Sequence, residues 1–384
     1  MMQFRCGLSK ICVSASLQKQ VLRHAHGHDQ TRALSSSLVD PSFLRYWGKS
    51  KGGYEDKPII REAKIVSLSD PHDDANAALN YGELPIGAKL LQIGTKLEEF
   101  DIDALRREEP NVIFCAHPLS RKPLVELLDA LPTVEWVHTR SAGIDFVTSP
   151  GLATSRVYMT NARGQFSSTL AEYTLMACSY YAKDIPRLMS QKKAKLWSKY
   201  DVLELRGSTM GIVGYGDIGR ACAKLARIYG MRIVALRRNP KLAWGDPLCD
   251  NVLPSTPEAL NELMSQSDYI LVSAPLTEET RGLIGREQFQ HAKEGAVFIN
   301  LGRGPVVDEN ALIDALKSGK LKGAALDVFT EEPLPTESEL WELENVLISP
   351  HNMVRTCTIS CAPHCLHTPH AAPARHIHNP THAH

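Results

Sequence analysis

The stretch TMGIVGYGDIGRACAKLARIYGMRIVALRR, residues 209–238, decides the fold of this chain. It opens with an apolar run and then carries three glycines in the spacing G-x-G-x-x-G, at Gly214, Gly216 and Gly219. A helical pattern follows and stops at Gly230, after which a second apolar run begins. The glycine spacing occurs by chance in many chains, but here it joins a strand to a helix inside a complete βαβ unit, which predicts a dinucleotide-binding turn.

Each glycine has a separate task in such a turn. Gly214 permits the tight turn, Gly216 lets a pyrophosphate approach the backbone, and Gly219 lets the helix pack close to the strand. The first N–H groups of the helix and its dipole then hold the phosphates. The residues of the turn that we expect to contact a cofactor are Gly214, Tyr215, Gly216, Asp217, Ile218 and Gly219.

The residues after the second apolar run indicate which dinucleotide binds. An NAD site places Asp or Glu at this strand end, where its carboxylate accepts hydrogen bonds from the ribose, but here Arg237 and Arg238 stand there. Two guanidinium groups suit a 2′-phosphate, so we expect NADP as cofactor, with NAD as the alternative. The structural alternative is that one arginine only lies along the strand end with its charge in water.

The rest of the chain between about residues 62 and 350 repeats the same alternation of apolar runs and helical stretches. Such strands are typical of parallel sheets covered on both faces, which predicts an α/β fold with two doubly wound, Rossmann-like domains and a cleft between them. We expect a substrate domain over 62–161, a cofactor domain over 162–350 and one long helix over 167–193 at their junction. The predicted strands are 64–68, 111–116, 134–139, 157–160, 209–215, 232–237, 269–274, 296–301, 323–328 and 346–349.

Composition excludes several classes of partner. The 43 Lys and Arg residues balance 43 Asp and Glu residues, so the formal net charge is zero and no basic surface for nucleic acid is expected. No apolar run reaches the roughly 18 to 20 residues that span a bilayer, so we expect no membrane partner. The nine cysteines are odd in number and scattered, which argues against a disulfide framework and favours a reducing compartment.

Both ends of the chain differ from the middle. The first 36 residues carry five basic residues, Arg5, Lys10, Lys19, Arg23 and Arg32, but one acid, Asp29. This composition predicts that residues 1–60 hold a transit peptide for the mitochondrion, with plastid or cytoplasm as alternatives and a plain disordered extension as the other interpretation. Residues 354–384 form a tail rich in His, Pro and Cys. Its cysteines lack the C-x2-C spacing of zinc sites, so we favour low-complexity disorder over metal binding and expect no metal site.

Three polar residues follow predicted strands downstream. Arg303 comes directly after one strand, and His351 follows the last. Glu332 stands directly before Pro333 and follows the predicted strand 323–328, which comes between the strands that precede Arg303 and His351. Because open α/β sheets bind ligands at the carboxyl ends of their strands, we expect these side chains to share one site.

These motifs identify a family. The segments GIVGYGDIG, APLTEETRGLIG, NLGRGPVVDENAL, ALDVFTEEPLP and SPHN, within residues 62–353, resemble the D-isomer-specific 2-hydroxyacid dehydrogenases, which include phosphoglycerate dehydrogenase and glyoxylate/hydroxypyruvate reductase. The resemblance implies that Arg303, Glu332 and His351 are catalytic and that Asp327 lies beside the nicotinamide amide. It also implies that Ala274 and Pro275 lie under the adenosine side, and that backbone amides at Ser141, Ala142 and Gly143 hold the substrate carboxylate. Further cofactor contacts are expected at Thr280, Leu301, Gly302 and Arg303.

The residue types suit the reduction of a small 2-keto acid such as glyoxylate or hydroxypyruvate. A protonated His351 donates a proton to the keto oxygen, Glu332 orients the imidazole and keeps it charged, and Arg303 binds the carboxylate. The resemblance further implies a homodimer. The alternative is a scaffold or sensor that binds a dinucleotide without turnover, against which the retained Arg, Glu and His weigh. After Met353 the sequence departs from the family pattern, which continues with a helix.

Overall fold

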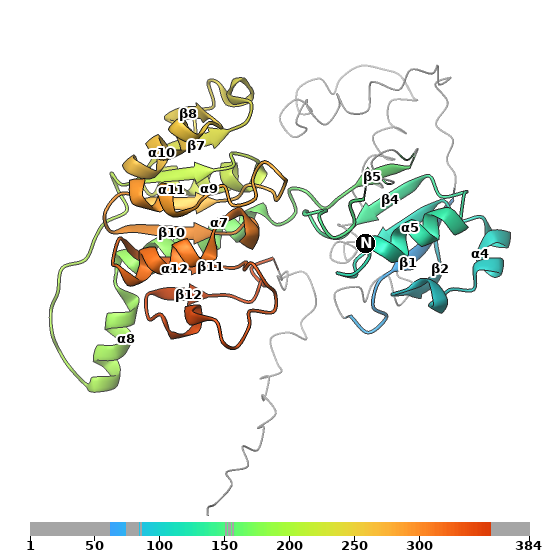
Figure 1. The fold of residues 1–384 in the computed structure, drawn as a ribbon, viewed down its shortest axis with the longest axis horizontal. Coiled ribbons are helices and arrows are strands. Elements are labelled where there is room, and N and C mark those ends of the chain that lie inside the picture. Colours follow the sequence, from blue (N-terminus) through green and yellow to red (C-terminus); the bar gives the residue numbers. More distant parts are fainter. Residues whose placement is uncertain are drawn as a thin grey trace, which may run out of the picture. The chain divides into compact units, whose positions relative to one another are not determined.

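The computed structural model describes residues 62–73, 84, 87–149, 152, 155 and 157–354. The predicted transit peptide over 1–60 lies outside these residues, as does the predicted tail beyond Val354. The described residues form two parallel sheets with helices (Figure 1). The predicted α/β class with two parallel-sheet regions is confirmed. Within the described residues, no helix is both long enough and apolar enough to cross a bilayer.

The first sheet has five strands in the order β2-β1-β3-β4-β5, and every pair is parallel. Its strands are β1 (Ala63–Leu68), β2 (Ala88–Gly94), β3 (Val112–Cys115), β4 (Trp136–Thr139) and β5 (Tyr158–Thr160). The short helix η3 (Leu97–Glu99), α4 (Ile102–Glu108) and α5 (Arg121–Ala130) connect them. Leu105 of α4 and Leu124 of α5 pack with Val66 and Ile113 of the strands in one buried core. The sheet therefore has its own hydrophobic core.

The second sheet has seven strands in the order β12-β11-β10-β9-β6-β7-β8, again parallel throughout. Its strands are β6 (Thr209–Val213), β7 (Arg232–Arg237), β8 (Asn251–Pro254), β9 (Tyr269–Val272), β10 (Ala296–Asn300), β11 (Leu321–Leu326) and β12 (Val346–Ile348). The connecting helices are α9 (Asp217–Ile228), α10 (Pro257–Gln266), α11 (Arg286–His291) and α12 (Glu309–Lys317), with short turns η4 (Pro240–Ala243), η5 (Gly304–Val306) and η6 (Glu339–Glu342).

Alternate residues of these strands face two separate cores. Val213 and Phe298 pack in the core that includes residues of α10, α11 and α12. Ile212 and Ile299 pack in the core that includes residues of α9 and of α7 (Ser167–Ala182), the long helix that comes before this sheet in the chain. Since side chains alternate along a strand, helices on both faces explain why the strands are apolar at nearly every position.

Two strands were missed by the sequence prediction, β2 and β8, and both lie at sheet edges. An edge strand has one unpaired side and is less completely buried, so its sequence need not be a continuous apolar run. The strand NVLP of β8 is exposed at both ends and only half-buried between them. Its pattern therefore resembles a loop when the sequence is considered alone.

The prediction of one long helix over 167–193 was wrong. The structure has two helices, α7 (Ser167–Ala182) and α8 (Ile185–Ala194). Asp184 between them has a φ of 50° and its side chain accepts a hydrogen bond from the Arg187 N–H, at 3.3 Å. Pro186 at the start of α8 lacks the N–H that a continuous helix would need, so the chain ends one helix and caps a new one.

Candidate active site

The turn between β6 and α9 has the geometry of a phosphate cradle. Gly214 has a φ of 97°, a conformation that favours glycine. A Cβ atom at Gly219 would lie 2.7 Å from the Gly214 carbonyl oxygen and 2.9 Å from Ile212, so only glycine allows α9 to approach the strand this closely. At Gly216, by contrast, a Cβ atom would meet no heavy atom within 4 Å. The open space thus lies at the N-terminus of α9, where unpaired N–H groups favour an anion, and the site fits the pyrophosphate of a dinucleotide.

Ala274 brings three strand ends together. A Cβ atom at Gly214 would lie 2.6 Å from the Ala274 nitrogen, and one at Gly302 would lie 2.7 Å from the Ala274 carbonyl oxygen. These residues follow β6, β9 and β10, which are neighbours in the sheet. After Ala274 the loop is closed by the Thr280 hydroxyl, which donates to the Pro275 carbonyl at 2.6 Å. The predicted cofactor residues Gly214, Ala274 and Gly302 therefore form one contiguous surface.

Not every predicted side chain of the cradle faces that surface. Tyr215 is 2% exposed, and its phenol donates to Asp246 at 3.3 Å. Burial, followed by the nearby Asp246 charge, raises the pKa of Tyr215. Asp217 is paired with Arg163 of the segment that precedes α7, and Ile218 packs against the core. The side chains of these three predicted residues are engaged within the protein, and the Tyr215 N–H also donates to the Leu236 carbonyl at 3.1 Å. The backbone N–H groups of Asp217 and Ile218 at the start of α9 are therefore the ones expected to meet a ligand.

Arg237 and Arg238 lie at the carboxyl end of β7, as predicted. Arg237 is half-buried, whereas the side chain of Arg238 is 87% exposed and lies 3.6 Å from Glu279. The sequence analysis missed Glu279, which belongs to the loop that also carries Thr280. A ligand phosphate at this strand end would meet the guanidinium of Arg237 and that of Arg238, which is weakly paired in water.

Glu332 and His351 form a direct pair. The Nδ1 atom of His351 lies 2.8 Å from one carboxylate oxygen of Glu332, while the Phe329 N–H donates to the other oxygen at 3.0 Å. Both side chains are partly exposed, at 37% for Glu332 and 38% for His351. His351 has a φ of 51°, which non-glycine residues seldom adopt, and its N–H donates to the Ser349 carbonyl at 2.9 Å. The tight turn after β12 therefore aims the imidazole at Glu332.

The pair shifts both groups toward their charged forms. The hydrogen bond that His351 donates to Glu332 raises the pKa of His351 above its usual range, although burial and the charge of Arg303 oppose the shift. Burial would raise the pKa of Glu332, but hydrogen bonds from His351 and from the Phe329 amide bring that pKa below its usual range. An imidazolium held by a carboxylate near neutral pH is a suitable proton donor.

Arg303 is held by the loop that follows β4. Its Nε donates to Asp145 at 3.0 Å, and one terminal nitrogen donates to the Gly302 carbonyl at 2.9 Å. A Cβ atom at Gly143 would lie 1.5 Å from the other terminal nitrogen, so any larger residue there would displace the end of the Arg303 side chain. The predicted substrate loop, Ser141 to Gly143, thus contacts the predicted arginine directly. Asp145, two residues further on, was missed by the sequence analysis.

Side chains and backbone groups near this loop keep it in shape. The Asn161 amide donates to the Ala142 carbonyl at 2.6 Å, and the Thr139 hydroxyl donates to the Ser141 carbonyl at 3.0 Å. On the Arg303 side, the buried Asn300 accepts from the Gly302 N–H at 3.1 Å. The only sequence signal for such residues is a polar side chain directly beside an apolar strand.

Asp327 is buried and supports the turn of His351. Its carboxylate accepts from the Ser349 hydroxyl at 2.6 Å and from the Asn352 N–H at 3.1 Å. Burial raises the pKa of Asp327, and these hydrogen bonds oppose the rise. Asp327 therefore ties the end of β11 to the turn after β12. Among the described residues, no group of three His, Cys, Asp or Glu side chains could hold a metal ion.

Comparison with known proteins points to the same chemistry. Residues 175–352 match the family described as D-isomer specific 2-hydroxyacid dehydrogenase, NAD binding domain. That range contains the glycine turn of the second sheet and all three of Arg303, Glu332 and His351. The second sheet with its helices is therefore an NAD(P)-binding domain.

Individual relatives extend beyond that domain. A glyoxylate reductase from Korarchaeum cryptofilum is 35% identical over 232 residues, which are 59% of this chain and 68% of that protein. The glyoxylate/hydroxypyruvate reductase B of Enterobacter sp. is 34% identical over 240 residues, which are 60% of this chain and 72% of that protein. A D-isomer specific 2-hydroxyacid dehydrogenase from Xanthobacter autotrophicus, solved with NADPH and MES, superposes with a TM-score of 0.60 at 31% identity, over 75% of this chain and 88% of that one. Sequence and structure thus agree over more than two thirds of each relative, and the chain belongs to the D-isomer specific 2-hydroxyacid dehydrogenase family.

Proposed function

We propose that the protein transfers a hydride between NADP(H) and a small 2-keto or D-2-hydroxy acid, with glyoxylate and hydroxypyruvate as the expected substrates. The observation that carries the proposal is the 2.8 Å contact between His351 and Glu332, whose pKa values are shifted toward a charged imidazole and a charged carboxylate. A protein that only bound a dinucleotide would have no need of such a proton donor. Relatives named glyoxylate reductase and glyoxylate/hydroxypyruvate reductase support the substrate class.

His351 supplies the proton in this mechanism. With Nδ1 directed to Glu332, the Nε2 atom of the imidazolium is the one available to a substrate oxygen. As negative charge develops on the keto oxygen, His351 donates its proton, and Glu332 stabilises the charged ring before that step. A bound NADPH supplies the hydride that reduces the carbonyl carbon.

Arg303 and the loop at Ser141 to Gly143 bind the substrate carboxylate. Asp145 and the Gly302 carbonyl occupy Nε and one terminal nitrogen of the guanidinium. The remaining terminal nitrogen is the one nearest Gly143, which places it beside the loop where the carboxylate is expected. Arginine suits this task because its charge is permanent and its donors are rigidly arranged.

The test follows the consumption of NADPH by the purified full-length chain with glyoxylate, hydroxypyruvate or pyruvate. We expect turnover with at least one of the first two. The variant His351→Ala is expected to lose turnover by a factor of about 100 or more while it keeps its cofactor affinity, because general acid catalysis is typically worth this much. Cofactor binding without turnover of any 2-keto acid would refute the reductase proposal and favour a dinucleotide-binding scaffold.

A preference for NADP over NAD is part of the proposal. It is supported by the two arginines at the end of β7, which stand where the strand of an NAD site ends in Asp or Glu. A structural relative solved with NADPH has 31% identity to this chain, which is consistent with this cofactor. Direct measurement of the Michaelis constants for NADPH and NADH decides the point.

We also propose a homodimer. Its support is a set of large apolar side chains that α8 and the segment after it expose to solvent: Leu188, Met189, Leu196, Trp197, Val202 and Leu203. Trp197 is 96% exposed, and such exposed apolar clusters commonly mark contacts between proteins. Light scattering on the purified chain tests the state, and a monomer at micromolar concentration would refute it.

Mitochondrial localisation is the remaining part of the proposal and rests on the acid-poor, basic composition of the first 36 residues. A fluorescent fusion of the full chain is expected to reach mitochondria, whereas a fusion without residues 1–60 is expected to stay outside. Equal distributions of the two fusions would contradict the prediction.

A further inference from the structure

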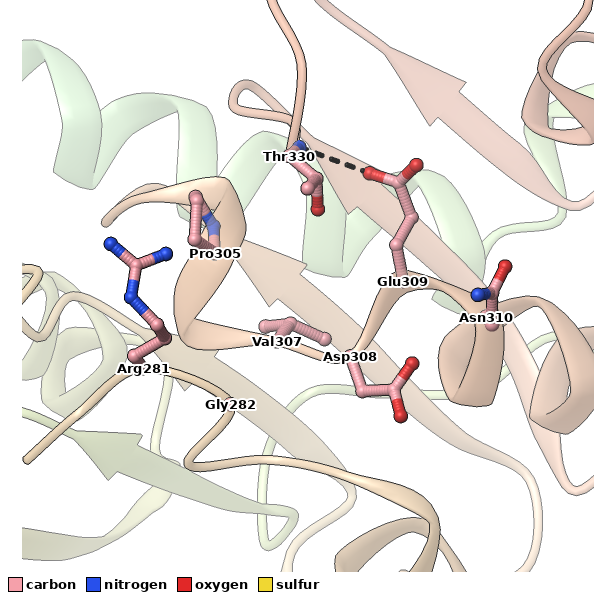
Figure 2. Close-up of a pocket in the computed structure, with 8 residues that line it drawn as sticks. All are labelled: Arg281, Gly282, Pro305, Val307, Asp308, Glu309, Asn310 and Thr330. Atoms are coloured by element: carbon pink, nitrogen blue, oxygen red, sulfur yellow. Dashed lines mark hydrogen bonds between the residues drawn. The ribbon is translucent and has the colours of Figure 1, made fainter. Parts of the chain in front are cut away.

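The carboxylate of Glu309 holds a backbone amide close to the proposed proton donor. Glu309 is the first residue of α12, and its Oε2 atom accepts a hydrogen bond from the Thr330 N–H at 3.1 Å. Figure 2 shows the Glu309 side chain reaching across to the chain at Thr330, while Asp308 points the other way. Glu309 and Thr330 line a pocket of about 350 Å³ together with Arg281, Pro305 and Asn310. The Glu309 contact therefore forms one wall of this pocket.

Gly304 secures the same peptide unit from another side. A Cβ atom at Gly304 would lie 1.8 Å from the Phe329 carbonyl oxygen and 2.4 Å from the Thr330 nitrogen. The two backbones are thus packed directly against each other. The segment from Arg303 to Glu309 consequently holds the peptide between residues 329 and 330 by a close backbone contact and by one hydrogen bond.

That peptide begins the short loop that ends at Glu332. Within this loop the Phe329 N–H donates to Glu332, and the next N–H, of Thr330, donates to Glu309. Two successive amides are therefore each bound by a carboxylate, one inside the loop and one from α12. Without the Glu309 oxygen, the Thr330 amide loses its carboxylate acceptor, and the backbone contact with Gly304 alone holds the peptide from this side. The loop can then shift, and the Glu332 carboxylate shifts with it because it is anchored to the same loop.

We propose that Glu309 is a positioning residue, which holds the loop at residues 329–332 so that the Glu332 carboxylate meets the His351 imidazole. The inference rests on the proposed reductase function for its kinetic consequence, although the contact itself is independent of it. It also links the two halves of the site, because the segment that starts with Arg303 is the one that orients Glu332. Glu309 touches neither the imidazole nor, in our mechanism, the substrate.

The consequence is a change in the titration of His351. The charged groups that act on this imidazole are Glu332, Arg303 and Asp327, and the hydrogen bond that the imidazole donates to Glu332 is the largest of these effects. Arg303 opposes the charged ring, so any weakening of the Glu332 contact lowers the pKa of His351. Since the reduction of a keto acid uses the protonated ring, the rate then falls first at alkaline pH.

The experiment compares Glu309→Ala, Glu309→Asp and Glu309→Gln in the full-length chain. The pKa of His351 is followed by NMR of the labelled imidazole, and the rate of keto-acid reduction is followed from pH 6 to pH 9. We expect Glu309→Ala and Glu309→Asp to lower the His351 pKa by about 0.3 to 0.7, with a loss of rate of about twofold to fivefold at pH 8. Aspartate retains the charge at the start of α12 but is one methylene too short to reach Thr330. Glutamine retains an acceptor oxygen and is expected to stay within about twofold of the original rate.

Two further variants complete the comparison. Glu332→Gln removes the partner itself and sets the full size of the effect, whereas Asn310→Ala alters a neighbouring wall of the pocket and is expected to leave the His351 titration as it was. An unchanged His351 pKa in both Glu309→Ala and Glu309→Asp, beside a lowered one in Glu332→Gln, would overturn the inference. If Glu309→Ala fails to fold, Glu309→Asp decides alone. If the original chain reduces no keto acid, the proposed function fails while the NMR titration still decides the role of Glu309.

Discussion

Replacement of Glu332 by glutamine should move the pH dependence of the reaction to lower pH. In the original chain the hydrogen bond that His351 donates to Glu332 raises the pKa of His351 and so keeps the ring protonated at higher pH. Glutamine removes the negative charge at nearly constant volume, so the ring should lose its proton at lower pH. The alkaline limb of keto-acid reduction should shift accordingly. Oxidation of the hydroxy acid, which uses the neutral ring, should reach its plateau at lower pH.

The size of the shift follows from the geometry. The two side chains lie 2.8 Å apart but are 37% and 38% exposed, so water screens the pair. Charge-assisted hydrogen bonds contribute about 1.5 to 3 kcal/mol, and exposed pairs about 0.2 to 1 kcal/mol. A half-exposed pair at good distance should contribute about 1 kcal/mol, which is about 0.7 of a pKa unit. At pH 8 the protonated fraction, and with it the reduction rate, should fall about fivefold from this effect alone.

Stability should follow the same linkage. Because the pKa of His351 is raised by folding, the ring contributes stability below its unfolded pKa of about 6.5, and this contribution is lost as the pH rises through the folded value. Glu332, whose pKa is lowered, contributes above its unfolded value of about 4.3 and loses its contribution as the pH falls through the folded one. Glu332→Gln should therefore cost about 1 kcal/mol near pH 6 and less at alkaline pH, where His351 is neutral and only the Phe329 amide and Arg303 still stabilise the carboxylate.

The assay is the initial rate of NADPH oxidation with saturating keto acid at half-unit steps of pH, together with the free energy of unfolding at pH 6 and pH 9. Glu331→Gln is the matched control, since it removes a neighbouring exposed carboxylate and should leave the alkaline midpoint in place. An unchanged midpoint in Glu332→Gln would refute the assignment of His351 as the proton donor held by Glu332. A shift of equal size in Glu331→Gln would show that the His351 pKa responds to any nearby negative charge and not to the direct contact with Glu332.

Three further changes test other parts of the site. Gly216→Ala should fold with an unchanged melting temperature, because a Cβ atom there meets open space. The same variant should bind the cofactor more weakly in a fluorescence titration, and an unchanged affinity would show that the cofactor phosphates do not occupy that space. Changing Arg237 and Arg238 together to alanine should raise the Michaelis constant for NADPH at least about tenfold more than that for NADH, since charge-assisted contacts to the 2′-phosphate are lost; equal effects would contradict the NADP preference. Asp145→Asn should raise the Michaelis constant of the keto acid by about threefold to tenfold, because the Nε contact of Arg303 at 3.0 Å is weakened; a change in cofactor affinity instead would mean that the loop serves the dinucleotide.

Much of the fold was predictable because strand and helix patterns act over short distances. The ten predicted strands all correspond to strands of the two parallel sheets. The two strands that were missed, β2 and β8, lie at edges, where partial exposure removes the continuous apolar pattern. The break between α7 and α8 was visible in the sequence as Asp184 followed by Pro186, but the apolar pattern on either side concealed it.

The candidate site was predictable in its residue types but not in its supports. Glycine spacing and polar residues at strand ends indicated the cradle and the set of Arg303, Glu332 and His351. Asp145, which binds Arg303 from 158 residues away, was not predictable, because an acidic residue in a loop has many possible partners. The same holds for Glu309, whose contact with Thr330 depends on how α12 lies against the end of β11.

By itself the sequence determined the local structural features, which are the tight turn at Gly214, the anion-binding start of α9 and the alternation of strands and helices. These arise from backbone torsions and helix dipoles, which operate within a few neighbouring residues. Only the tertiary structure decided that β6, β9 and β10 lie side by side and that Gly214, Ala274 and Gly302 touch. Only the packed structure, likewise, brings a carboxylate within 2.8 Å of His351 and so shifts its pKa, because charge effects of this size require contact in space and not proximity in sequence.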